Sequence, residues 1–117
     1  MASDSSEPGL AYLTTSGRIS GSAHQIEIWF AMGEGTAYFL AGDGDRSDWV
    51  RNIMVSPDVV LEIGGRKRST RARVVAAGSE EDATARELVV GKYTARGEAN
   101  LSDWGRRALA VAVDWPD

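Results

Sequence analysis

Apolar and polar side chains alternate along several short segments of this chain, and the alternation predicts β-strands. In residues 24–31, Ile26, Ile28 and Phe30 fall on one face, whereas Gln25, Glu27 and Trp29 fall on the other. Because successive side chains of a strand point to opposite faces, this pattern is typical of a half-buried strand. Similar patterns predict five more strands, at residues 10–15, 36–41, 59–63, 66–77 and 108–115.

Two other segments have helical spacing of their apolar residues. Ser47 is positioned as the N-cap of one helix, which is predicted to reach about Val55. Ser79, followed three residues later by Asp82, resembles a capping box and predicts a second helix through about Tyr93.

Glycine-rich turns connect the predicted strands in hairpin order. Gly33 and Gly35 follow the strand at 24–31, and the Gly64-Gly65 pair separates two further strands. Six strands with only two short helices favour a mainly β (α+β) fold, an antiparallel barrel rather than a parallel sheet. Because so small a barrel is filled by its own side chains, a large ligand is expected outside it, in a groove shared with a second copy in a homodimer.

The composition fits one globular domain without disulfides. The 117 residues contain no cysteine, and the apolar and charged shares are 43% and 26%. We expect a disordered tail at residues 1–9 and a domain at 10–117. The polar N-terminus lacks a signal-peptide pattern, and no apolar run approaches the roughly 20 residues that span a bilayer, so we expect a cytoplasmic protein without membrane insertion. A net charge of −4 argues against nucleic-acid binding.

The segment after the first predicted strand has the chemistry of an anion site. It contains Gly17, Arg18, Ser20 and Gly21. A glycine-rich turn can direct backbone N–H groups toward a phosphate, to which Arg18 adds a guanidinium and Ser20 a hydroxyl. The alternative is an ordinary turn with a solvated arginine.

This segment, Thr14-Thr15-Ser16-Gly17-Arg18-Ile19-Ser20-Gly21, resembles the Thr-Thr-x-Gly-Arg-x-Ser-Gly signature of the deazaflavin-dependent nitroreductase-like proteins. The likeness continues through Gly42 to Asp45, Asp48-Trp49, Asn52, Ser56-Pro57 and Gly64-Gly65, with a weaker echo at Trp104. The resemblance implies a six-stranded split β-barrel of the PNP-oxidase-like type. It also implies a reductase that uses the 8-hydroxy-5-deazaflavin coenzyme (F-420) to pass hydride to a quinone, nitroaromatic or enone substrate.

The resemblance implies that the loop from Gly42 to Ser47 passes beside the cofactor ring and ribityl chain. This chain departs from the relatives in having Asp43, Asp45 and Ile19 where many of them have lysines. Carboxylates repel an acidic cofactor tail, so FMN or another planar anion remains an alternative ligand. The residues expected to contact the cofactor are Arg18, Ser20, Gly21, His24, Gly42, Asp43, Gly44, Asp45, Arg46 and Trp49.

Several of these residues also have simpler interpretations. Trp49 lies on the apolar stripe of its helix and is expected mainly in the core, and His24 could be an exposed residue at the start of a strand. Five cations between Arg66 and Arg73 are typical of a solvated strand, or could attract an acidic tail. Tyr93 could donate a proton or only pack. We therefore assign no catalytic residue and no metal site, and a non-catalytic dimeric binding module remains an alternative function.

Overall fold

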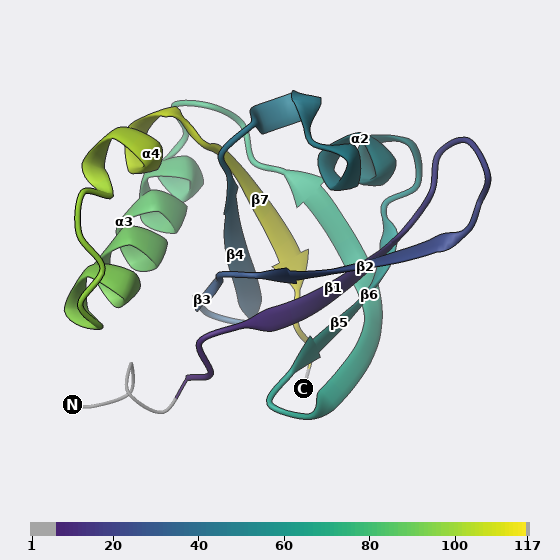
Figure 1. Cartoon of the computed structure of the whole chain (residues 1–117), viewed down its shortest axis with the longest axis horizontal. Coiled ribbons are helices and arrows are strands. Elements are labelled where there is room, and N and C mark those ends of the chain that lie inside the picture. The colour runs from purple at the N-terminus through teal and green to yellow at the C-terminus, as the bar shows by residue number, and fades with distance from the viewer. Residues whose placement is uncertain (1–6, 117) are drawn as a thin grey trace.

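The computed structural model describes residues 7–116, which form one antiparallel sheet of seven strands with helices at its two ends (Figure 1). The strand order is β2-β1-β5-β6-β7-β4-β3. The strands are β1 (Ala11–Ser16), β2 (Ala23–Ile28), β3 (Ala31–Met32), β4 (Thr36–Ala41), β5 (Asp58–Ile63), β6 (Arg66–Val74) and β7 (Leu109–Asp114). The helices are the 3-10 turn η1 (Gly44–Arg46), α2 (Asp48–Val55), α3 (Glu80–Ala95) and α4 (Ser102–Arg107).

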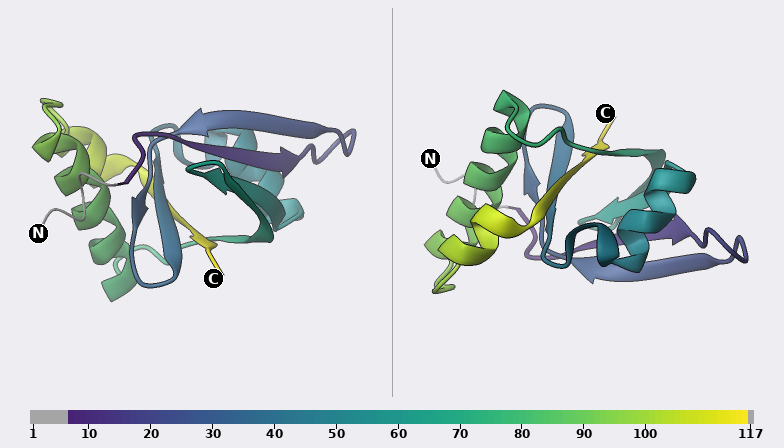
Figure 2. Two further views of the ribbon diagram at one scale, coloured as in Figure 1. Left: turned by 90° about the horizontal axis from the view of Figure 1, so that it is seen from below. Right: turned by 90° about the horizontal axis from the view of Figure 1, so that it is seen from above.

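The sheet curls because the chain passes directly from one of its edges to the other. β2 and β3 are the two outermost strands, yet only Trp29 and Phe30 separate them in sequence. The long strand β6 belongs to both halves, since residues 66–71 pair with β5 and residues 72–74 with β7. The result is the predicted antiparallel split barrel, seen along two further directions in Figure 2.

The prediction of six strands was wrong by one, because residues 24–31 form two strands rather than one. The bend lies at Phe30, whose backbone is bonded by side chains of α3 instead of by a neighbouring strand. Its N–H donates to Tyr93 Oη at 3.0 Å, and its carbonyl accepts from Lys92 Nζ at 2.7 Å and lies 3.1 Å from Tyr93 Oη. Side chains that replace the ladder end the strand there, and the chain resumes as β3.

Two apolar cores lie on opposite faces of β4 and β7. The barrel interior contains Leu13, Phe30, Phe39, Leu61, Val111 and Val113. The outer core, beneath α3, includes Tyr38, Leu40, Val89, Tyr93 and Ala110. Because both faces of β4 and β7 are covered, these two strands are almost wholly buried. α2 lies at the opposite end of the barrel from α3 and α4 (Figures 1 and 2).

The local signals at turns and helix ends were partly correct. Gly64 and Gly65 both have positive φ, at 60° and 82°, as the predicted two-residue hairpin requires. The Ser79 hydroxyl accepts from the N–H of Asp82, which confirms the cap of α3. Ser47 precedes α2 but makes no side-chain cap. The short helix α4 was not predicted.

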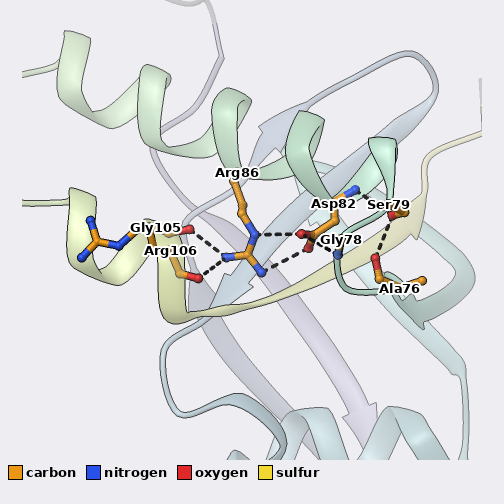
Figure 3. A network of polar contacts seen from close by, with 7 residues as sticks. All are labelled: Ala76, Gly78, Ser79, Asp82, Arg86, Gly105 and Arg106. Carbon is orange, nitrogen blue, oxygen red and sulfur yellow. Dashed lines mark hydrogen bonds and ion pairs between the residues drawn. The ribbon is translucent and has the colours of Figure 1, made fainter.

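A half-buried arginine joins α3 to α4 (Figure 3). Arg86 donates from Nε and Nη2 to the carboxylate of Asp82, at 3.1 Å each, and from Nη1 to the carbonyls of Gly105 and Arg106 at 2.7 and 3.3 Å. It therefore satisfies carbonyl groups of α4 that lack a partner within so short a helix. This cross-link fixes α4 against α3.

The start of the described chain is held against α3. Lys92 Nζ donates to Pro8 O at 2.8 Å, Tyr93 Oη to Gly9 O at 2.8 Å, and Arg96 Nη2 to Glu7 O at 2.6 Å. Of the predicted disordered tail, residues 7–9 are thus fixed by hydrogen bonds, while the rest lies outside the described residues. Within 7–116, no helix is long and apolar enough to cross a membrane.

Replacing Asp82 with asparagine should lower the free energy of unfolding by about 2 kcal/mol at pH 7, because it removes a partly buried charged pair. The hydrogen bonds from Arg86 hold the pKa of Asp82 below its ordinary value, with a smaller contribution from the Gly78 N–H, against the opposing effect of burial. A lowered native pKa means that this stability is present above the ordinary carboxyl pKa and is lost as pH falls through the native value.

Urea denaturation at a series of pH values tests this. The difference between the parent and Asp82→Asn should shrink as pH falls below about 4. Glu87→Gln, an exposed change on the same helix, serves as the control and should cost little at any pH. A difference that is independent of pH would contradict the assignment.

Candidate functional site

A cleft of about 680 Å³ opens between β2, α2 and the loop that joins β1 to β2. It lies at an edge of the sheet, because β2 is an edge strand, and residues of α2 line the other side of the cleft. The lining residues are Thr15, Gly17, Arg18, Ile19, Ser20, Ala23, His24, Gln25, Ile26, Asp48, Trp49 and Asn52. Its size is within the roughly 300–1,000 Å³ of typical small-molecule sites.

The loop at the mouth of the cleft is closed by its own backbone. Gly17 N–H donates to Ser22 O at 2.7 Å, Gly21 N–H donates to Gly17 O at 2.8 Å, and Gly21 has a φ of 77°. The Ser22 N–H donates to Ser20 Oγ at 3.2 Å. Three of the loop amides expected to surround a phosphate are thus already bonded within the loop. Anion binding by this loop therefore depends mainly on its side chains.

Arg18 is anchored at the base of the loop rather than solvated. Its backbone N–H and its Nη1 both donate to Oδ1 of Asn52, at 3.1 and 2.9 Å, and its Nη2 donates to Asp48 Oδ1 at 3.3 Å. The Arg18 side chain is 25% exposed, whereas that of Asp48 is 85% exposed, so water weakens the ion pair. The positive charge of Arg18 remains available to the cleft.

His24 lies across the loop from Arg18, on the same cleft. A methyl group added at Gly17 would lie 2.8 Å from His24 Nε2 and 3.1 Å from Ser20 Oγ, so the imidazole and the serine hydroxyl both pack against this glycine. The absence of a side chain at Gly17 therefore allows His24 and Ser20 to approach each other. Both are potential hydrogen-bond partners for a ligand.

Trp49 belongs both to the core and to the cleft. Its ring packs edge to face with Phe39 at a centroid distance of 6.4 Å, and it is half-buried against the barrel interior. Its remaining surface lines the cleft together with Ile26. The core packing expected for Trp49 is confirmed, and its remaining surface gives the cleft an apolar wall.

The second predicted segment does not line this cleft in the single chain. Gly42, Asp43, Gly44, Asp45 and Arg46 form a turn and η1, just before α2. A methyl at Gly42 would lie 3.3 Å from the ring of Trp104, and the carbonyl of Asp45 accepts from Arg51 Nε at 2.9 Å. Of the ten predicted contacts, the cleft brings together Arg18, Ser20, His24 and Trp49, while Gly21 serves the turn behind them.

Sequence reasoning did not assign a role to Asn52 or Asp48, both of which line the cleft. Asn52 is 3% exposed, and its Nδ2 donates to Thr15 Oγ1 at 3.1 Å. The available signal was a polar residue among the apolar residues of a short helix, since Val50 and Ile53 beside it are buried. A buried amide at such a position needs partners from elsewhere in the fold.

The basic strand has protein partners at several of its cations. Arg73 makes a bidentate pair with Glu81 at 2.7 Å, Arg71 lies 3.4 Å from Asp58, and Arg68 stacks over Trp115. A shallow depression of about 460 Å³ on the outer face of β1, β5 and β6 includes Arg71. These contacts favour the solvated-strand interpretation.

Tyr93, considered as a proton donor, lies in the outer core. It is 4% exposed and stacks on Trp29 at a centroid distance of 4.1 Å. Burial raises the pKa of Tyr93 above its ordinary value. Its hydroxyl serves the chain bend at Phe30. Within 7–116, no group of three or more histidine, aspartate or glutamate side chains could hold a metal ion.

Residues 5–116 match the model of the F420H(2)-dependent quinone reductase family. The chain belongs to this family. The predicted deazaflavin-dependent reductase family is thereby confirmed, and the protein is an oxidoreductase. No protein of curated function matches the sequence.

Solved structures share the fold of this F420H(2)-dependent quinone reductase family member at low sequence identity. An F420-H2 dependent reductase (FDR-A) is 19% identical, with a TM-score of 0.73 over 91% of this chain and 94% of that one. A domain-swapped dimer is also 19% identical, with a TM-score of 0.74 over 92% and 81%. A heme storage protein from Vibrio cholerae (HutZ) is 14% identical, with a TM-score of 0.69 over 93% and 82%. They bear out the split-barrel fold.

In this reductase, Gly17→Ala should displace the imidazole of His24, because the new methyl would be closer to it than van der Waals contact allows. His24 is the only histidine of the chain, so its ring signals in an NMR spectrum can be followed directly. We expect them to shift while the protein stays folded. Gly91→Ala, whose added methyl meets no atom within 4 Å, should leave them in place. Unchanged His24 signals in Gly17→Ala would show that the two residues do not pack as described.

Proposed function

We propose that this protein binds the reduced deazaflavin coenzyme in the cleft between α2 and the β1–β2 loop and reduces a quinone, nitroaromatic or enone substrate. The single observation that carries the proposal is the placement of Arg18. Its guanidinium is anchored by α2 and lines the cleft of about 680 Å³, together with Ser20, His24 and Trp49.

The residues of the cleft suit an anionic, partly aromatic ligand. Arg18 can give a phosphate charge-assisted hydrogen bonds, and Ser20 and His24 add further donors at the same end. Trp49 and Ile26 offer an apolar surface against which a planar ring can pack. Asp48 is the sole carboxylate among the lining residues, and its exposure limits its repulsion.

When bound, the reduced deazaflavin supplies the hydride. The protein then has to bind the coenzyme, hold it in one orientation and keep water from its ring. Arg18 and Ser20 would fix the phosphate end, and Trp49 would support the ring. We assign no proton donor, since Tyr93 is buried in the outer core and its hydroxyl is hydrogen-bonded to the backbone of Gly9 and Phe30.

The loop from Gly42 to Arg46 would meet the ligand beyond the cleft. It precedes α2 directly, and Asp48 in the first turn of that helix already lines the cleft. The exposed carboxylates of Asp43 and Asp45 then lie where they would disfavour an oligoglutamate tail. FMN, which has no such tail, is the second candidate ligand for the same reason.

We further propose that the protein works as a homodimer whose partner completes the open side of the cleft. Large apolar side chains are exposed at this end of the barrel: Ile19 is 92% exposed, Met54 61% and Val55 66%. A second copy covering them would also shield the ligand from water.

Light scattering at micromolar concentration should give twice the mass of one chain. Ile19→Ser should shift the balance toward the monomer, because it removes apolar area that association would bury. Ser22→Ala, an exposed change on the same loop, is the control. A monomer mass for the parent protein would remove the dimer from the proposal.

Coenzyme binding tests the proposal directly. Arg18→Ala should weaken binding of the deazaflavin coenzyme about ten- to hundredfold, because charged hydrogen bonds are worth roughly 1.5–3 kcal/mol each. Fluorescence polarisation and the coenzyme-dependent shift in melting temperature measure this. Arg66→Ala, an exposed arginine at the far end of β6, should bind as the parent does.

Turnover tests the proposed substrate class. Oxidation of the reduced coenzyme, followed by its absorbance, should accelerate when protein and a quinone are both present. Parallel binding titrations with FMN and heme identify the ligand if the deazaflavin fails. Absence of any coenzyme binding by the parent would contradict the proposed function.

A further inference from the structure

Asn52 is the one polar side chain of α2 that is buried, and each of its polar atoms has a partner in the β1 end of the cleft. Oδ1 accepts from the Arg18 N–H at 3.1 Å and from Arg18 Nη1 at 2.9 Å. Nδ2 donates to Thr15 Oγ1 at 3.1 Å, and Thr15 is 1% exposed. The side-chain amide of Asn52 thus connects α2 to the end of β1, at Thr15, and to the following loop, at Arg18.

The choice of an amide at this position has an electrostatic consequence. A buried arginine is usually held by a carboxylate, which neutralises it. An amide oxygen instead orients the guanidinium without cancelling its charge. The carboxylate of Asp48 lies further away, at 3.3 Å from Nη2, and is mostly in water. One N–H of the Arg18 guanidinium donates to Asn52 and one to Asp48. The remaining N–H groups of the five can donate to a ligand.

We propose that Asn52 is a positioning residue that sets the anion affinity of the cleft by fixing Arg18 in place while leaving its positive charge unneutralised. The inference rests on the proposed function for the identity of the ligand, but the electrostatic claim concerns any phosphate-bearing anion. If the role of Asn52 were purely structural, its replacement would lower the stability of the protein and its affinity for all ligands alike. A positioning residue affects phosphate-bearing ligands through Arg18.

Asn52→Asp is the most informative change. It keeps the shape and both acceptor contacts to Arg18, and it adds a negative charge beside the guanidinium. Three ligands are titrated: inorganic pyrophosphate, the deazaflavin coenzyme, and the same ring carrying only its ribityl chain. We expect at least about tenfold weaker binding of the first two and less than about twofold change for the phosphate-free third.

A double-mutant cycle locates the cause. In an Arg18→Ala background, Asn52→Asp should weaken binding of either phosphate-bearing ligand several-fold less than it does in the parent, because only the direct repulsion by the new carboxylate remains. Met54→Ala, an exposed change on the same helix, is the matched control and should leave all three affinities unchanged. An equal loss for the phosphate-free ligand, or a full loss in the Arg18→Ala background, would overturn the proposal.

The parent protein provides a test that does not depend on a folded variant. Titration with pyrophosphate, followed by NMR, should shift the signals of the Arg18 guanidinium and of the Asn52 side-chain amide together. Saturation by pyrophosphate without movement of either signal would refute the role of Asn52, as would no pyrophosphate binding at all.

The outcomes separate this inference from the proposed function. If pyrophosphate binds in an Asn52-dependent way and the coenzyme does not bind, the anion site stands and the deazaflavin assignment falls. If the coenzyme binds parent and Asn52→Asp equally, the deazaflavin assignment stands and the role of Asn52 falls.

Discussion

The structure depends on how the backbone of Phe30 is satisfied. A continuous strand across residues 24–31 would keep β2 and β3 in line, and the sheet would stay open. Instead Tyr93 and Lys92 of α3 take both polar groups of the Phe30 backbone, so the chain turns there and joins the two edges of the sheet. The same two side chains hold Pro8 and Gly9, which brings the start of β1 to the same point. Closure of the barrel, placement of α3 and entry into β1 are thus coupled.

The cleft follows from this closure at the other end of the barrel. Since β2 meets β3 only through the bend, β2 remains an edge strand, and the cleft lies between it and α2. The loop between β1 and β2 then projects over the gap. Hydrogen bonds within the loop hold its backbone, and Asn52 of α2 accepts a hydrogen bond from the guanidinium of Arg18. The fold thus provides an open cleft beside a hydrogen-bonded loop, rather than an enclosed cavity, for a ligand.

Much of the fold could be predicted because its signals are local. Alternation marks β7, paired glycines mark the hairpin at Gly64 and Gly65, and Ser79 marks the start of α3. The bend at Phe30 could not be predicted, since its cause lies more than sixty residues away at Tyr93. The helix α4 has six residues and is fixed by Arg86 rather than by its own sequence.

The candidate site divides in the same way. Arg18, Ser20, His24 and Trp49 were found because they are close in a recognisable motif or on a helix stripe. Asn52 was missed because its role consists of contacts with Thr15 and Arg18, which are distant in sequence. Whether Asp43 and Asp45 reach a ligand depends on groups outside the single chain's cleft, which no local pattern encodes.

The burial of Lys92 has a consequence for the chemistry of the surface. The chain contains two lysines, Lys67 and Lys92, and Lys92 is 2% exposed, with its amine engaged by Pro8 and Phe30. Amine-directed reagents would therefore modify the native protein at Lys67, on the β5–β6 hairpin, well before Lys92. Acylation of the second lysine would report the opening of the junction between α3, the bend and the entry to β1, and could be followed by mass spectrometry without any knowledge of the ligand.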